Sequence, residues 1–172
     1  YKRQTQYDSN HKWIKYLKGG KYRKWNGNLE YLLFYNNDPN YILEQAHARV
    51  LPLEMLRKPK ITCTMLTSGR PGFRSAPEDS FYDIAAHCCF PKEPQFNYIL
   101  GLLNSSLSAL CLSAQNPTMN MQVSDIASVP YVEGDPKSVS KVSGIVAESS
   151  DISKIDWDSF ETSWDFKRHP LL

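Results

Sequence analysis

The chain has 172 residues, of which 41% are hydrophobic and 12% aromatic, and its formal net charge at pH 7 is +2. This length fits one domain, and the apolar content is sufficient to bury a core, which excludes an intrinsically disordered protein. The sequence has no run of about 18 apolar residues and no leading basic-then-apolar signal segment, so we expect a cytoplasmic protein without a membrane partner.

The charges are distributed unevenly along the chain. Residues 1–74 contain 14 Lys and Arg against 5 Asp and Glu, a net charge of +9, whereas residues 75–172 contain 6 against 13, a net charge of −7. This asymmetry indicates a basic surface facing a polyanion and an acidic surface facing protein or solvent. The alternative is that the two halves mix their charges in three dimensions.

The first notable segment, residues 12–28, interleaves cations with aromatic residues around a Gly19-Gly20 pair. Its cations can neutralise phosphates, its glycines let backbone amides approach a phosphate, and its aromatic rings can stack on a base. The alternative is a solvated basic edge strand. The segment contributes eight candidate DNA-binding residues: Lys15, Lys18, Gly19, Gly20, Lys21, Arg23, Lys24 and Trp25.

Alternating strands and helices are predicted after this segment. The aromatic-rich run at 29–35 predicts a buried strand, and Asp38-Pro39 predicts the start of a short helix that extends to about Val50. Residues 61–67 predict a second strand and 81–90 a third.

The turn at Ser68–Gly72 carries two further candidate DNA-binding residues, Arg70 and Arg74. Glycines beside arginine suit a loop that enters a DNA groove, where the guanidinium can contact the two major-groove acceptors of guanine. An exposed turn with incidental arginines is the alternative.

Residues 95–114 show the strongest helical pattern. Phe96, Ile99, Leu100, Leu103, Leu107 and Leu110 recur at three- and four-residue steps. They predict one amphipathic helix whose apolar face lies in the core, ending at Asn116-Pro117. The order of elements predicts an α+β fold with a mixed β-sheet and a helical C-terminal appendage.

The composition changes near Glu133–Pro136, where we place a domain boundary. Residues 1–135 would form the recognition domain, and residues 136–172 a helical, acidic tail leading to the next domain. The apolar stripe of residues 137–150 suits a neighbouring domain or subunit, so a chain ending near Pro136 is expected to stay folded.

Four blocks of the sequence resemble PglX-type methyltransferases of bacterial bacteriophage exclusion (BREX) systems. KGGKYRKWNGN at 18–28 is similar to a family signature that has an aromatic residue where Asn26 stands. KITCTMLTSGRPGFR at 60–74 resembles a second block, with Lys60 in place of Gly and Cys63 in place of Trp. Residues 102–132 and 156–172 resemble the family's closing helix segment and tail, and residues 102–132 also resemble type I specificity subunits and type IIG restriction-modification enzymes.

This resemblance implies an α+β target recognition domain that reads double-stranded DNA within an adenine-specific methyltransferase, in phage exclusion or restriction-modification. The methyltransferase domain of the same parent chain would hold S-adenosylmethionine and would be a partner, as would other defence-system subunits. The sequence begins at Tyr1 rather than Met, which fits a piece excised from a longer protein or a trimmed terminus.

We expect no catalytic residue, metal or cofactor within these residues. Asn116-Pro117-Thr118-Met119 lacks the second proline and the aromatic ring with which adenine methyltransferases hold a flipped base, and no glycine-rich cofactor loop follows a strand. The cysteines and histidines lack metal-ligand spacing, so we expect reduced, partly buried thiols. Two other functions remain open: a protein-interaction module of a defence complex, and a small enzyme of unknown type.

Overall fold

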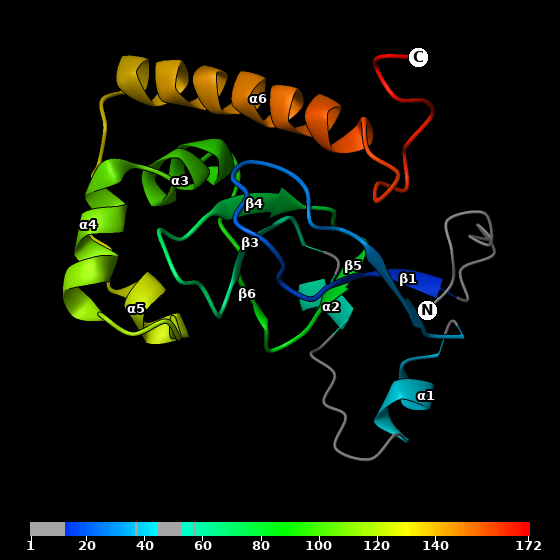
Figure 1. Ribbon diagram of the computed structural model, residues 1–172. Coiled ribbons are helices and arrows are strands. Elements are labelled where there is room, and N and C mark those ends of the chain that lie inside the picture. The colour runs from blue at the N-terminus through cyan, green and yellow to red at the C-terminus, as the bar shows by residue number, and fades with distance from the viewer. Residues whose placement is uncertain (1–12, 37, 45–52, 57) are drawn as a thin grey trace.

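The computed structural model describes residues 13–36, 38–44, 53–56 and 58–172. Its described part contains two three-stranded sheets, several short helices and one long C-terminal helix, which confirms the α+β class (Figure 1).

The first sheet has the strand order β2-β1-β5 and is mixed. Strand β1 (Trp13–Leu17) pairs antiparallel with β2 (Tyr31–Phe34) and parallel with β5 (Ser80–Tyr82). The predicted strand at 29–35 is therefore present, slightly shorter than expected.

The second sheet has the order β4-β3-β6 and is antiparallel throughout. Its central strand β3 (Lys60–Thr64) lies between β4 (Phe73–Ala76) and β6 (Ala86–Cys89). Because side chains alternate along a strand, Ile61 and Cys63 lie on the same face and are both buried in the core.

The single strand predicted at 81–90 is wrong: the segment forms β5 in one sheet and β6 in the other. The chain turns at Asp83, whose backbone N–H donates to the Leu17 carbonyl (2.9 Å) and whose carboxylate accepts from the Tyr16 hydroxyl (3.0 Å). These contacts with β1 end β5 and direct the chain toward the second sheet.

Short helices connect the two sheets. Helix α1 (Pro39–Leu43) begins as predicted, with the Asp38 side chain accepting from the Asn40 N–H, and the expected continuation to Val50 falls on residues outside the described part. Helix α2 (Leu53–Leu56) precedes β3.

The single helix predicted at 95–114 is also wrong, because it is divided into α3 (Phe96–Leu103) and α4 (Ser106–Gln115), bent by 59°. The bend rotates the second half of the stripe out of the core, so Leu107 and Leu110 are 50% and 66% exposed. Helix α5 (Val123–Ala127) follows.

Helix α6 (Pro136–Asp158) lies along α3, on the side away from most of the second sheet (Figure 1). Its start is capped by Asp135, which accepts from the N–H groups of Lys137 and Ser138. Gly101 of α3 allows the close approach: a Cβ there would lie 2.9 Å from Val146 and 3.0 Å from Val142. The boundary at 135/136 stays a prediction, and this packing argues for one structural unit.

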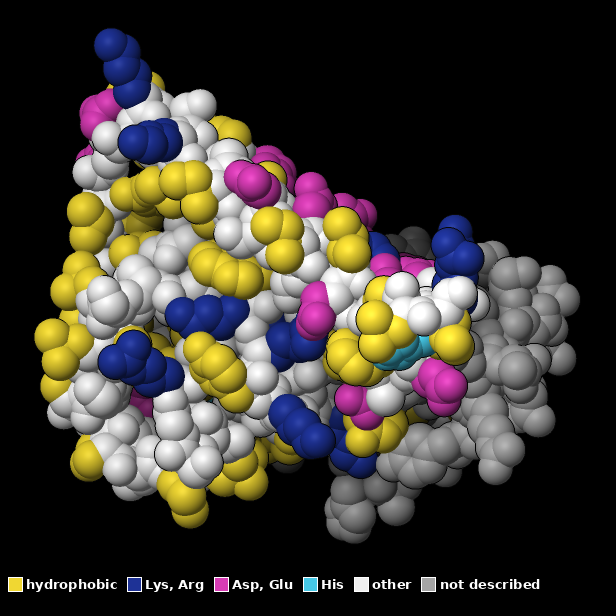
Figure 2. Space-filling model, turned by 45° about the horizontal axis from the view of Figure 1, so that its top comes forward, with side chains coloured by type: hydrophobic (Ala, Val, Ile, Leu, Met, Phe, Trp, Pro, Cys, Tyr) yellow, Lys and Arg dark blue, Asp and Glu magenta, His cyan; other side chains and the backbone are white. Residues whose placement is uncertain are grey.

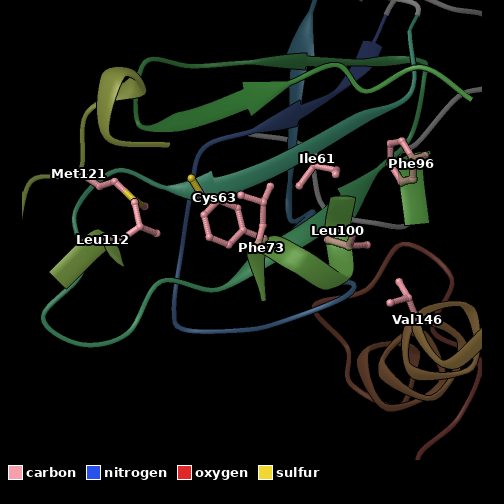
Figure 3. Packing of buried hydrophobic residues seen from close by; sticks show 9 residues of the cluster. Ile61, Cys63, Phe73, Phe96, Leu100, Leu112, Met121 and Val146 are labelled. Atoms are coloured by element: carbon pink, nitrogen blue, oxygen red, sulfur yellow. The ribbon is translucent and has the colours of Figure 1, made fainter. Parts of the chain in front are cut away.

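One cluster of buried side chains joins the second sheet to the helices (Figure 3). The cluster combines Ile61, Cys63 and Phe73 of the sheet with Phe96 and Leu100 of α3, and its other members are Leu103, Leu112, Met121 and Val146. Val146, from α6, is only 2% exposed, so the C-terminal helix helps to form the core.

Within the described residues, no single helix has both the length and the apolar composition required to cross a membrane. Helices α3 and α4 reach those values only when they are taken together across their bend.

Candidate functional site

The first feature of the site is the loop that follows β1. Gly19 adopts a left-handed φ of 79°, and a Cβ on it would lie 2.8 Å from the Ala85 carbonyl oxygen, so glycine is required there. The buried Asn28 side chain donates to the Lys21 carbonyl (2.7 Å) and closes the loop. The Gly-Gly segment is thereby fixed against the second sheet.

The second loop joins β3 to β4. The Thr67 N–H donates to the Met119 carbonyl (2.9 Å), and Gly72 lies so close to the Arg23 backbone that a Cβ would approach its carbonyl oxygen to 2.4 Å. The loop is thus held at both ends, while Ser68, Gly69 and Arg70 at its tip are exposed.

These two loops face each other across a cavity of about 390 Å³, which brings both sequence-predicted basic motifs together. Lys21 and Arg70 are exposed at its rim, and Arg74 lines its floor. The lining consists of Gly20, Lys21, Tyr22, Thr64, Leu66, Thr67, Ser68, Gly69, Arg70, Gly72 and Arg74, and none of these described residues is acidic.

Arg74 is 2% exposed and has no carboxylate partner among the described residues. Its terminal nitrogens donate to the carbonyls of Arg23 (3.3 Å) and Gly72 (3.4 Å) and to the Thr64 hydroxyl (3.3 Å), while its Nε has no hydrogen-bond partner. Burial lowers the pKa of Arg74 to about 10, so it remains charged at neutral pH. Arg74 therefore holds the two loops together and places a buried positive charge beneath the cavity.

Arg23 points away from the cavity, toward α6. Its guanidinium donates to the carbonyls of Asn26 (2.8 Å) and Ser153 (2.9 Å), forms a salt bridge with Asp156, and lies 5.2 Å from the centre of the Trp157 ring. These contacts give Arg23 a structural role that the sequence did not reveal.

Lys24, Trp25 and Lys15 also make internal contacts. The Lys24 ammonium donates to the Asn104 carbonyl (2.8 Å), and Trp25, with a φ of 71°, packs against the core cluster. Lys15 lines a separate cavity together with tail residues, and its charge contributes to lowering the pKa of Asp165, after the larger effect of Lys154.

The predicted site residues other than Lys15 therefore fall into two groups. The first group is exposed and consists of Gly20 and the three cations Lys18, Lys21 and Arg70. No described carboxylate forms a salt bridge with any of these cations. The second group, which holds the loops, the core and α6 in place, consists of Gly19, Arg23, Lys24, Trp25 and Arg74. Lys15 is half-buried near the C-terminal tail and belongs to neither group.

The charged halves of the chain mix only in part. Asp156 and Asp165 of the acidic tail lie near Arg23 and Lys15, whereas the cavity side keeps unpaired cations. Figure 2 shows the same partial mixing: many acidic side chains lie along the upper ridge, whereas Lys and Arg side chains stand both on the face below it and at its upper-left end.

Sequence reasoning missed two exposed side chains of the cavity, Tyr22 and Leu66. Tyr22 stood within the basic, aromatic segment, and Leu66 gave no signal of its own.

A second hollow, of about 230 Å³, lies on the other side of the loop tip, toward residues 116–119. The tip around Arg70 thus stands between two depressions of the surface.

The four thiols are free, and three of them are chemically quiet. Burial raises the pKa of Cys63 to about 12, that of Cys88 to about 11 and that of Cys89 to about 12, so these thiols stay protonated at neutral pH. No group of three or more potential metal ligands occurs among the residues that the structure describes.

No family model matches the chain, but two known proteins are similar to it over most of its length. The chain is 30% identical over 166 residues to the adenine-specific methyltransferase BrxX of Escherichia coli O9:H4 (strain HS), covering 95% of this chain and 13% of that protein. It is 27% identical over 169 residues to the adenine-specific methyltransferase PglX of Lacticaseibacillus casei (strain Zhang), covering 93% of this chain and 14% of that protein. Over most of its length, the chain is a distant homologue of a small part of these methyltransferases.

Proposed function

We propose that the chain recognises double-stranded DNA, as the target recognition domain of an adenine-specific DNA methyltransferase in a BREX or related restriction-modification system. The cavity between the two loops carries the proposal, because it gathers unpaired cations that come from separate parts of the sequence. The distant homology to adenine-specific methyltransferases supports the same assignment.

The residues would divide the work of recognition. Lys18 and Lys21 are exposed and would neutralise DNA phosphates, which supplies affinity that is independent of sequence. Arg70, at the exposed loop tip, would contact a base edge, because its planar fork matches the two acceptors of guanine. Arg74 would keep the loop in position for that contact.

Methyl transfer would take place elsewhere in a longer parent protein. We propose that its methyltransferase domain binds S-adenosylmethionine and a flipped adenine, in the cytoplasm, while this domain selects the site. The chain spans 13% and 14% of the two relatives, which leaves most of their length for that chemistry.

Duplex binding at increasing salt concentration tests the proposal. We expect the Lys18→Ala/Lys21→Ala variant to reduce the slope of log affinity against log salt by roughly 1.8, at about 0.9 for each lost phosphate contact. Fluorescence anisotropy with a labelled duplex measures this slope. The control variant Lys137→Ala/Lys141→Ala removes the same charge from exposed positions on α6 and should leave the slope unchanged.

Two outcomes would count against DNA recognition by this surface: duplex binding that does not depend on salt, or an equal reduction of the salt slope in both variants. Arg23 and Lys24 are unsuitable for this test, because their replacement would break internal hydrogen bonds.

A protein-interaction function is the second candidate, and the outer face of α6 favours it. Ile145, Ile152 and Ile155 are exposed there, more than half of each side chain's surface being accessible. We propose the methyltransferase domain of the same parent as the occupant, since the chain is homologous to a small part of much longer adenine-specific methyltransferases. Replacing Ile152 and Ile155 with Glu should then reduce methylation by the parent enzyme while leaving duplex binding by this chain intact.

A further inference from the structure

We propose that the cavity between the two loops holds one phosphate of the DNA backbone, with Lys21 at its rim and Arg74 at its floor. The inference rests on the proposed function and adds to it the chemical group that the cavity binds.

The first argument is the uncompensated charge of Arg74. A buried cation is normally paired with a carboxylate or fully hydrogen-bonded, because the loss of hydration is costly. Arg74 has neither: no carboxylate pairs with it among the described residues, its Nε is without a partner, and its other bonds are long, at 3.3–3.4 Å. An anion in the cavity would supply the missing countercharge.

A second buried cation in the same sheet, Lys60, has a complete set of hydrogen-bond acceptors. The Lys60 ammonium donates to the carbonyls of Leu56 (2.8 Å), Pro77 (3.0 Å), Glu78 (3.0 Å) and Ser80 (3.0 Å). Lys60 lines none of the cavities described here and needs no external partner. The contrast singles out Arg74 as the cation for which a ligand is missing.

The second argument is the composition of the cavity wall. Lys21 and Arg70 are charged donors, Thr67 and Ser68 carry hydroxyls, and the glycines expose backbone. These groups donate hydrogen bonds to phosphate oxygens, and no described lining residue would repel an anion. At about 390 Å³ the cavity lies at the small end of ligand sites, the size range for a phosphate group with part of its sugar.

The third argument favours a phosphate over a base as the group that binds in the cavity. Arg74 is 2% exposed, so it cannot extend into a groove to read a base edge. Its charge can still act over a few ångströms on an anion above it, where the protein interior screens weakly. A phosphate bound here would fix the register of the duplex and leave Arg70, at the loop tip, free to contact a base.

Inorganic phosphate is the direct probe, followed by NMR on the whole chain. We expect the amide signals of Gly20, Gly69 and Gly72 to shift saturably as phosphate is added at constant ionic strength. The Lys21→Ala variant should raise the half-saturating concentration about tenfold, whereas Lys141→Ala, with the same loss of charge on α6, should not change it. Arg74→Lys should bind phosphate and Arg74→Met should not; because Arg74→Met can also unfold the loop, Lys21→Ala keeps the test independent of folding.

Duplex DNA identifies the source of the phosphate. If one backbone phosphate occupies the cavity, Lys21→Ala should lower the salt slope by about 0.9 without changing preference among duplex sequences. Duplex binding with an unchanged slope and no saturable phosphate shifts would overturn this inference and leave the proposed function standing. Phosphate binding without any duplex binding would overturn both, since the cavity would then serve a small phosphorylated ligand.

Discussion

Two buried cations show how far residue-level prediction can reach. Arg74 was identified from the sequence as a possible base reader, and Lys60 was noticed only as a replacement for glycine in the resemblance. Their burial depends on the pairing of β4 with the central strand β3 in the second sheet, which is a long-range property. The sequence therefore identified the basic motifs but could not separate exposed cations from buried ones.

Replacing Lys60 with Met should destabilise the fold while preserving volume. The carbonyls of Leu56 and Ser80 would lose the ammonium as donor in a buried environment, whereas the Pro77 carbonyl keeps the Ser80 hydroxyl (2.6 Å). A buried acceptor left unsatisfied costs about 1–3 kcal/mol, so we expect the free energy of unfolding at pH 7 to fall by about 2–3 kcal/mol, because partial relaxation offsets the rest. Urea denaturation measures the change, and Lys58→Met, at an exposed lysine nearby, is the control. A loss below about 0.5 kcal/mol would show that water replaces the ammonium.

Lys60 should also give the stability a dependence on pH. Desolvation lowers its pKa to about 8 in the folded chain, against 10.5 ordinarily, so between these values the unfolded chain binds more protons. Stability contributed by this group therefore rises with pH from about 8 to 10.5, by up to about 1.4 kcal/mol per pH unit. The buried thiols act in the opposite sense above pH 9, because their pKa values are raised. The difference between wild type and Lys60→Met isolates the lysine and should widen over this range; a constant difference would mean that the carbonyls hold its pKa near the ordinary value.

Arg70 is the residue on which we expect sequence preference to depend. Its side chain is exposed at a loop tip held at both ends, and a bidentate contact with guanine discriminates by about 1–3 kcal/mol. Arg70→Ala in the parent enzyme should relax the methylated motif at one base pair and leave binding to unrelated duplexes nearly intact. Genome-wide mapping of methylated adenines provides the measurement. If the methylated motif is unchanged and only the level of methylation falls, we would conclude that other loops contact the bases.

At the scale of elements, the starts of helices were predicted better than their continuity. Asp38 caps α1 as expected from its sequence, since an N-cap is a local signal. The break between α3 and α4 is not local. The Asn104 side chain accepts from the Phe73 N–H (3.0 Å) and donates to the Phe73 carbonyl (2.9 Å), while Ser105 caps α4. Apolar periodicity contains no information about such contacts with a strand, which is why residues 95–114 were predicted as one helix.

Asn104→Ala should therefore destabilise the fold by about 2 kcal/mol. The substitution removes two buried hydrogen bonds to β4, and each contributes about 0.5–1.5 kcal/mol. Thermal unfolding followed by circular dichroism measures the loss. Asn97→Ala, a half-buried asparagine on α3, is the matched control, and equal effects of the two substitutions would refute the role assigned to Asn104.

At the scale of the whole molecule, the basic segment of residues 12–28 contacts both the cavity and the C-terminal helix. One side of the basic segment faces the cavity, and the other side is held by α6 through Arg23, Ser153 and Trp157. Part of the +9 charge of the first 74 residues is thus neutralised by the acidic tail, and the part that remains unpaired is concentrated at the cavity. The sequence predicted the asymmetry; which cations stay unpaired depends on how α6 packs.

The change in composition near Pro136 predicts that a chain ending there stays folded, but the packing of α6 predicts that it does not. Val146 is 2% exposed within the core, Gly101 brings α3 against α6, and Arg23 is held by three contacts with that helix. A chain ending at Gly134 would expose the apolar face of α3 and leave Arg23 without its partners, so we expect it to aggregate or to melt well below the full chain. Removing only residues 167–172, which are mostly exposed, is the control and should leave the melting temperature within about a degree, because few contacts are lost. If the chain ending at Gly134 instead unfolds cooperatively at the melting temperature of the full chain, α6 is a separate appendage and the boundary inferred from composition is right.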